Sequence, residues 1–318
     1  MRIRFALLLG FATLLACSLP SLTLPVTSDT TAATFVVQTP PALPPVVIET
    51  LTPASPEASP TATSIPTLLP NSLYFLANDN TSGHMQLFRL ERDGKTRYQL
   101  TYELSDVEDY DVSPRDGSVV YISNNQLLLV DANGRERRLL LDGGAIDPSN
   151  PWATSLDSPR WSPDGQIIAF RYRGLNFYAL DSGAVTPVLA DQIDSHSGFS
   201  FVRELYAPER YSPDGKRLLV RISFYEGGTF GVYNLAENTL VRFQERVCCT
   251  AVWTPDGNGV YAASASMGLM DSGLWFIDAA SGNVTTLLPG VAPDGTYNFA
   301  DAPYIGADGR LYFFFNNL

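Results

Sequence analysis

The sequence predicts an all-β fold, a β-propeller of four-stranded antiparallel blades, and three observations support this prediction. A turn ending in Asp-Gly recurs at intervals of 42 to 52 residues, a spacing typical of propeller blades. A second tight hairpin turn recurs inside each interval, so that each interval accommodates four strands. No segment has a sustained helical period of apolar residues. Four-stranded sheets repeated at this spacing indicate a propeller.

The turn that closes the first hairpin of each interval is Ser-Pro-Asp-Gly or a variant of it. Proline favours the first corner of such a turn, and aspartate bonds the backbone N–H groups that follow. We expect a structural role for these turns, with the preceding Trp161, Tyr211 and Trp253 packed between neighbouring blades. The five Asp-Gly pairs are Asp116-Gly117, Asp164-Gly165, Asp214-Gly215, Asp256-Gly257 and Asp308-Gly309.

The second hairpin consists of an apolar strand, an acid or Asn, and a turn with Gly or Asn. With both hairpins counted, the sequence contains four complete blades and a partial blade at each end. We therefore predict six blades, or five if the two ends combine into one. The complete blades are expected at 107–142, 156–190, 207–243 and 250–288, and the partial blades at 73–101 and 297–315.

The N-terminus has the pattern of an export signal. Two arginines precede an apolar stretch of eleven residues, Phe5 to Leu15, which is too short to span a bilayer. Ala16 and Cys17 follow, and this ending resembles the bacterial lipobox, in which the cysteine receives diacylglycerol before cleavage. We expect residues 1–16 to be a lipoprotein signal peptide and Cys17 to be lipidated. The mature protein would then be extracytoplasmic and anchored to the bacterial cell membrane by lipid.

A segment rich in proline and threonine separates the signal peptide from the repeats. Residues 18–72 contain 11 Pro and 11 Thr. Stretches such as 39–45 and 52–61 cannot form a helix or a central strand, because proline lacks a backbone donor and fixes φ. We expect 17–70 to be a disordered tether and 71–318 to be the propeller domain.

The Trp/Tyr-Ser-Pro-Asp-Gly turn followed by an apolar strand resembles the WD40-like, PD40-type repeat of the TolB-like propellers. The turns at 162–165, 212–215 and 254–257 match this repeat closely, whereas 113–117 has one additional residue and 306–309 lacks the proline. The resemblance implies a propeller fold over 71–318. It does not extend to the mixed α/β domain that precedes the propeller in TolB, so a TolB role does not follow from it.

Sequence motifs for catalysis are absent. The chain has two histidines, His84 and His196, and it contains neither a zinc-ligand spacing nor a Gly-x-Ser-x-Gly nucleophile elbow. We therefore predict a protein that is not an enzyme and has no cofactor. The net charge of −12 argues against nucleic acid as a partner, since an acidic surface repels phosphates.

One set of acidic residues suggests a binding site. Glu108, Asp157 and Asp301 each lie four residues before the Trp161-type position, where the first strand of a blade begins at the central channel. Two interpretations are open: they are solvated loop acids, or they surround one mouth of the channel and bind a cation or a basic group. Calcium is the metal that such oxygen ligands suit. Insertions at 191–206 and 264–272 are expected to shape the rim around this mouth.

Three interpretations are open for the adjacent Cys248 and Cys249: two small apolar residues before a strand, a disulfide between neighbours, or a reactive thiol. The function indicated by the whole sequence is a non-catalytic lipoprotein propeller that binds a protein or glycan of the cell envelope as a scaffold. The alternative is a propeller enzyme that acts on glycans or peptides.

Overall fold

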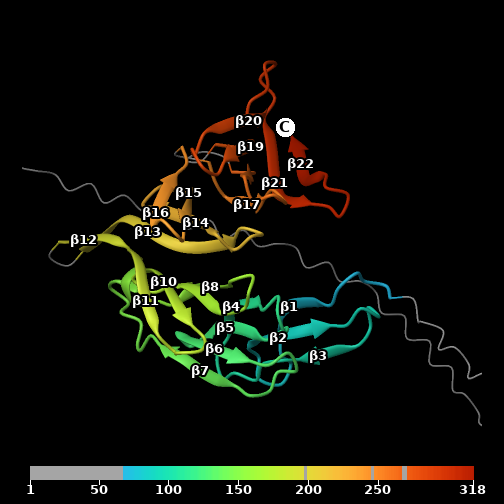
Figure 1. Ribbon diagram of the computed structural model, residues 1–318, viewed down its shortest axis with the longest axis vertical. Helices are drawn as coiled ribbons and strands as arrows, with labels where there is room; N and C mark the ends of the chain where they lie inside the picture. The colour runs from blue at the N-terminus through green and yellow to red at the C-terminus, as the bar shows by residue number, and fades with distance from the viewer. Residues whose placement is uncertain (1–66, 197–198, 245–246, 267–270) are drawn as a thin grey trace, which may run out of the picture. The chain divides into compact units, whose positions relative to one another are not determined.

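Antiparallel hairpins build the described part of the chain, and each sheet contains strands in their sequence order (Figure 1). The computed structural model describes residues 67–196, 199–244, 247–266 and 271–318. These residues belong to one compact unit, Thr63–Leu318. The predicted signal peptide, Cys17 and nearly all of the predicted tether lie outside the described residues, as does the middle of the insertion at 264–272.

Six sheets follow one another along the described residues, and we call them blades 1 to 6. Blade 1 contains β1 (Leu73–Asn78), β2 (Met85–Leu90) and β3 (Arg97–Gln99). Blade 2 contains β4 (Val107–Val112), β5 (Val119–Ser123), β6 (Gln126–Val130) and β7 (Arg138–Asp142). Blade 3 contains β8 (Asp157–Trp161), β9 (Ile167–Arg171), β10 (Gly174–Ala179) and β11 (Val185–Ala190).

The later blades differ more in their number of strands. Blade 4 contains β12 (Gln192–His196), β13 (Phe199–Tyr211), β14 (Arg217–Phe224), β15 (Gly227–Asn234) and β16 (Thr239–Arg242). Blade 5 contains β17 (Thr250–Trp253), β18 (Gly259–Ser264), β19 (Gly273–Asp278) and β20 (Val284–Pro289). Blade 6 contains β21 (Asn298–Ile305) and β22 (Leu311–Asn317).

This arrangement confirms the predicted all-β propeller with incomplete first and last blades. The insertion at 191–206, expected to be a loop between blades, instead forms a β-hairpin. Its strands are β12 and the first half of β13, which extend blade 4 to five strands. A single helical turn, α1 (Pro151–Thr154), lies between blades 2 and 3. No helix within the described ranges is long and apolar enough to cross a membrane.

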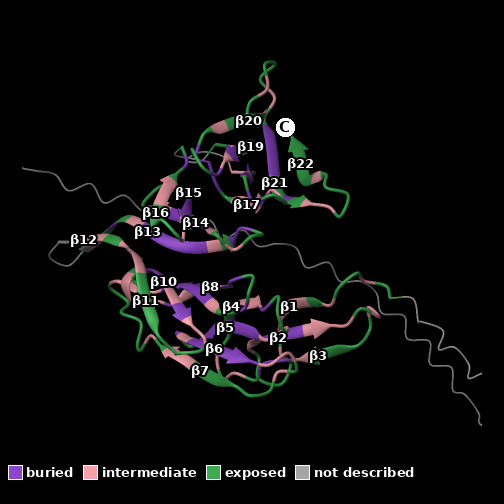
Figure 2. Ribbon diagram, viewed as in Figure 1, coloured by how far each residue is buried: buried purple, intermediate pink, exposed green. Residues whose placement is uncertain are grey.

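The apolar core lies between successive blades. The inner strands of each complete blade are its most buried parts, as β5 shows with all five residues buried (Figure 2) and β15 with six of eight. Five clusters of buried side chains each join residues from two consecutive blades. Trp161, Tyr211 and Trp253 belong to three of these clusters. Packing of neighbouring blades therefore supplies the hydrophobic stabilisation that a single four-stranded sheet lacks.

The Asp-Gly turns have one recurring geometry. Their glycines have φ between +66° and +75°, where an L side chain is strained. In the Asp164 turn, the Ser162 hydroxyl donates to the carboxylate at 2.6 Å, and the backbone N–H of Gln166 donates to the same oxygen at 3.0 Å. The Asp214 and Asp256 turns repeat this pattern with Ser212 and Thr254. These hydrogen bonds lower the pKa of the turn carboxyls, and the bond from the hydroxyl contributes most.

Candidate functional site

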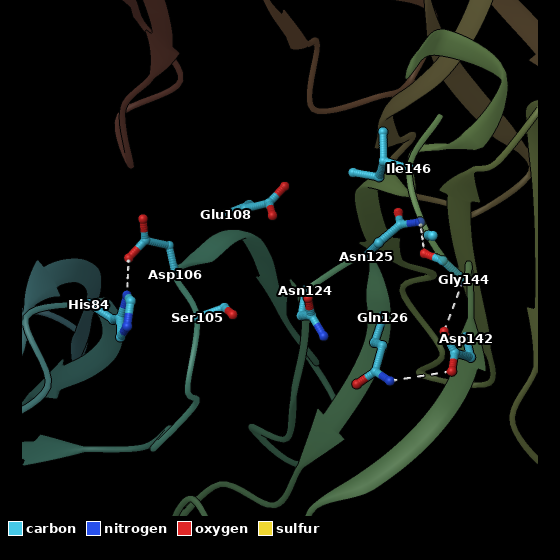
Figure 3. A pocket seen from close by; sticks show the side chains of 11 residues that line it. His84, Ser105, Asp106, Glu108, Asn124, Asn125, Gln126, Asp142, Gly144 and Ile146 are labelled. Carbon is cyan, nitrogen blue, oxygen red and sulfur yellow. Dashed lines mark hydrogen bonds and ion pairs between the residues drawn. The ribbon is translucent and has the colours of Figure 1, made fainter. Parts of the chain in front are cut away.

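Loops of blades 1 and 2 form a polar pocket with a volume of 720 Å³ (Figure 3). Three carboxylates line it together with side-chain amides, one histidine and the loop at 144–146. Neither lysine nor arginine is among the described residues that line the pocket. The histidine, carboxylate and amide side chains are His84, Asp106, Glu108, Asn124, Asn125, Gln126 and Asp142.

The β5–β6 turn forms one wall of the pocket because two asparagines adopt positive φ. Asn124 and Asn125 have φ of 49° and 56°, as a two-residue hairpin of the I′ type requires. Asn125 is buried, and its amide group donates to the carbonyls of Gly144 and Thr154, both at 2.9 Å. Its oxygen accepts from the backbone N–H of Leu156 at 2.7 Å. Asn125 thus fixes the loop behind the pocket, and Asn124 remains facing solvent (Figure 3).

Glu108 is positioned by a β-bulge. Along β4, Val107 pairs with Ser123 and Asp109 with Ile122, so Glu108 is an extra residue between two ladder positions. Bulges reorient side chains at the ends of sheets and are common beside functional sites. Irregularities recur in the first strands of blades 3, 4 and 6, where Asp157, Pro208 and Asp301 precede the register shift. The bulge is therefore a repeated feature of the first strand and not a local defect.

Two acids of the pocket, Asp106 and Glu108, have pKa values shifted in opposite directions. Asp106 accepts from the backbone N–H of Met85 at 2.8 Å and lies 3.2 Å from Nδ1 of His84, and these bonds hold its pKa below the usual value. Partial desolvation raises the pKa of Glu108, and the charges of Asp106 and Asp157 raise it further. In the described part of the chain, Glu108 has no hydrogen bond or ion pair (Figure 3).

The three acids singled out from the sequence are only partly brought together. Asp157 lies near enough to Glu108 to raise its pKa, but its carboxylate pairs with Nη1 of Arg171 at 2.6 Å. Asp301 lies in blade 6 and accepts from the Thr250 hydroxyl of blade 5 at 2.9 Å. Among the described residues, no group of three His, Cys, Asp or Glu side chains is placed to hold a metal ion. The expectation of calcium therefore has no support from the arrangement of these carboxylates.

A disulfide lies directly before β17, the first strand of blade 5, near the equivalent position. Cys248 and Cys249 are joined to each other, which decides among the interpretations of this pair. Cys248 is buried in the cluster between blades 4 and 5, and the backbone N–H of Cys249 donates to the carbonyl of Ala263. Neither cysteine is therefore a free thiol in this structure.

Most of the pocket residues could not be predicted from the sequence. Asp106 and Asp142 lie in different loops, and the repeat alignment gives no reason to combine them with Glu108. His84 was noted in the sequence without a partner, and the structure places it beside Asp106. The adjacent Asn124 and Asn125, which favour positive φ, were a local signal for a two-residue hairpin turn at this edge of blade 2.

Comparison with solved structures supports the fold. TolB from Acinetobacter baumannii matches with a TM-score of 0.51 and 16% identity, over 80% of this chain and 65% of that one. The chain folds as a TolB-like β-propeller. A putative TolB from Agrobacterium tumefaciens has a TM-score of 0.46 and 18% identity, over 77% of this chain and 86% of that one. This chain thus spans only 65% of the length of the Acinetobacter protein.

More distant matches do not bear on function. An oligogalacturonate lyase in complex with manganese has a TM-score of 0.39 and 13% identity, over 77% of this chain and 85% of that one. No family model matches this chain, and no curated protein matches it either. At these identities the likeness to solved structures concerns the fold alone and does not indicate a function.

Proposed function

We propose that the protein is a non-catalytic binding propeller whose pocket takes a basic group, a lysine or arginine side chain, of a cell-envelope protein. The observation that carries this proposal is the unpaired carboxylate of Glu108, which lines a polar pocket together with Asp106 and whose pKa is raised by burial and by the charges of Asp106 and Asp157. Like charges that lie close together raise one another's pKa unless a cation compensates them. A bound ammonium or guanidinium group would supply that compensation and donate hydrogen bonds to the carboxylates.

The rest of the chain supports a role at the membrane surface. We propose that residues 1–16 direct export, that Cys17 carries the lipid anchor, and that the segment up to residue 70 holds the propeller away from the membrane. The net charge of −12 favours encounters with basic proteins and disfavours nucleic acid. The propeller then acts as a scaffold that presents its pocket to other envelope components.

The pocket also contains a serine, a histidine and an aspartate, Ser105, His84 and Asp106, which are the residue types of a hydrolase catalytic triad. The alternative function is therefore hydrolysis through a serine nucleophile. A serine nucleophile needs a hydrogen bond to its histidine. Within the described residues His84 bonds to Asp106, and no hydrogen bond joins it to the Ser105 hydroxyl. This geometry favours binding over acyl transfer as the function of the pocket.

The direct test is calorimetric titration of the full-length protein with a capped tetra-lysine peptide. Glu108→Gln should weaken binding about 3- to 10-fold, or ~1 kcal/mol, as expected for a partly solvated ion pair. Affinity should also fall as the pH is lowered through the raised pKa of Glu108, because the proton competes with the cation for the carboxylate. Asp106 should stay ionised over this range, since its pKa is lowered.

Glu226→Gln is the matched control, because Glu226 is exposed in the turn between β14 and β15, far along the chain from the pocket. It removes the same charge and should leave the affinity and its pH dependence unchanged. Equal weakening in both variants would show that the peptide responds to net charge alone and would reject the pocket as the binding site.

A further inference from the structure

Two apolar side chains lie at the edge of the polar pocket and are open to solvent. Leu104 is 92% exposed and directly precedes Ser105 and Asp106, which line the pocket. Ile146 is 43% exposed and lines the pocket itself. In the view of Figure 3, Glu108 lies between Asp106 and Ile146, so the two apolar residues belong to loops on either side of the unpaired carboxylate. We call Leu104 and Ile146 the apolar pair.

The loop that carries Leu104 is fixed on both sides of this residue. The backbone N–H of Glu103 donates to the side-chain oxygen of Gln86 at 2.9 Å, and its carboxylate accepts from the Tyr121 hydroxyl at 2.7 Å. On the other side, the Asp106 carboxylate accepts from the first backbone N–H of β2 at 2.8 Å. Leu104 is therefore held in water by a loop that is bonded to blades 1 and 2, and its exposure does not come from a lack of local contacts.

Ile146 is held in the same way from the opposite loop. The carbonyl of Gly144 accepts from the buried amide of Asn125 at 2.9 Å, and the backbone N–H of Asp147 donates to the Thr154 hydroxyl at 2.9 Å. Hydrogen bonds thus fix the chain before and after Ile146. A ligand that covers the apolar pair does not have to order either loop, and this preorganisation favours binding.

The charge of the pocket indicates what kind of partner could cover the apolar pair. Three carboxylates line the pocket, and the described lining residues include neither lysine nor arginine. This charge repels the headgroups of anionic lipids and acidic peptides, and it attracts a basic side chain. Apolar groups placed on both sides of that basic side chain would exclude water from the ion pair, which strengthens the attraction between the charges.

We propose that the pocket selects a basic side chain that has apolar residues on both sides of it, in an extended segment of a partner protein. The basic group reaches Glu108, and the flanking apolar side chains pack on Leu104 and Ile146. This inference rests on the proposed function, in which the pocket binds a basic group. It adds that the apolar pair, and not charge alone, distinguishes the partner from other basic proteins.

Displacement of a fluorescent tetra-lysine peptide from the full-length protein tests this selectivity, because it reports binding at one site. Two capped pentapeptides, Leu-Ser-Lys-Ser-Leu and Ser-Ser-Lys-Ser-Ser, have the same charge, and in an extended chain their end residues lie on the same face as the lysine. In the wild type the leucine peptide should displace the label at about 10-fold lower concentration, because it buries apolar surface. Leu104→Ser combined with Ile146→Ser should reduce this ratio to about 2-fold or less and leave the serine peptide unchanged.

Leu287→Ser is the matched control, because Leu287 is 48% exposed in β20 of blade 5 and does not line the pocket. It should keep the selectivity of the wild type. Equal thermal unfolding temperatures of the three proteins would show that the substitutions leave the fold intact.

The possible outcomes separate this inference from the proposed function. If tetra-lysine binds and Glu108→Gln weakens its binding, but the two pentapeptides displace it equally, the pocket binds a basic group without selecting its neighbours and the inference is overturned. A selectivity that survives in the double variant also overturns it. If the serine substitutions dissociate a dimer and change neither pentapeptide, the apolar pair belongs to an interface between copies of the chain. Absence of tetra-lysine binding to the wild type would reject the proposed function and the inference together.

Discussion

At the residue scale, sequence is informative where a backbone conformation requires a particular residue. The Asp-Gly turns could be located because their glycines adopt positive φ and their aspartates bond the next backbone amides, and both requirements are local. Glu108 could be singled out by alignment, but the bulge that places it in the pocket could not. A bulge depends on how β4 pairs with β5, and that register is not encoded in either strand alone.

Two glycines of these turns have similar φ but different surroundings, so substitutions there can separate the effect of backbone strain from that of steric crowding. Gly165 and Gly215 have φ of +66° and +70°, so alanine at either position should cost about 1–2 kcal/mol through backbone strain. A Cβ at Gly165 would lie 2.9 Å from Cβ of Arg115, whereas at Gly215 the nearest atom is Pro163 Cδ at 3.5 Å. We therefore expect Gly165→Ala to lower the free energy of unfolding more than Gly215→Ala, as urea denaturation would measure. Equal losses of unfolding free energy in the two variants would show that backbone strain alone, and not steric crowding, determines the cost.

At the scale of elements, the sequence predicted the blades well and their insertions poorly. Each blade is two hairpins joined in order, so its strands follow from local turn chemistry. The segment at 191–206 has no repeat to align with and was expected to be a loop. It forms a hairpin whose start is fixed by Asp191, which accepts from the backbone N–H of Tyr206 at 2.8 Å and pairs with Arg171.

Arg171 should be the key side chain for this hairpin. Its side chain is 4% exposed and pairs with Asp191, which is 3% exposed, and with the more exposed Asp157. Arg171→Met would leave Asp191 buried without its cation, and we expect a loss of about 3–5 kcal/mol. Arg171→Met combined with Asp191→Asn should recover part of that loss, because no uncompensated charge is then buried.

The pH dependence of the stability loss in Arg171→Met provides an independent check that the loss comes from the unpaired carboxylate of Asp191. Burial raises the pKa of Asp191, and Arg171 opposes this increase. Without Arg171 the folded-state pKa rises further above the unfolded value, so the destabilisation is largest at high pH and diminishes as the pH falls through the folded-state pKa. Thermal unfolding of Arg171→Met at pH 7 and pH 5 should show a smaller deficit at pH 5. A deficit independent of pH would indicate lost packing and not an unpaired carboxylate.

At the scale of the whole molecule, the six sheets could be located from the sequence because blades 2 to 6 each carry an Asp-Gly turn of the repeat and blade 1 carries the second hairpin. Five apolar clusters hold successive blades together, and each forms between segments that are close in the chain. The partners of the two end blades could not be predicted in this way. Pairing between the start and the end of a chain depends on contacts that no local pattern specifies.

The membrane anchor is the remaining prediction at this scale, and it rests on Cys17. Lipid chains bind a bilayer by burying methylene groups at about 0.8 kcal/mol each, so two or more chains hold a protein almost permanently. Cys17→Ala should therefore abolish incorporation of labelled fatty acid and move the protein from the membrane to the soluble fraction. Ser18→Ala is the control, because it changes the next residue and leaves the thiol in place.

Because the apolar stretch before Cys17 has only eleven residues, it is too short to hold the variant as a membrane-spanning helix. A Cys17→Ala protein that stays in the membrane fraction, or a wild-type protein without label, would show that the cysteine is not lipidated.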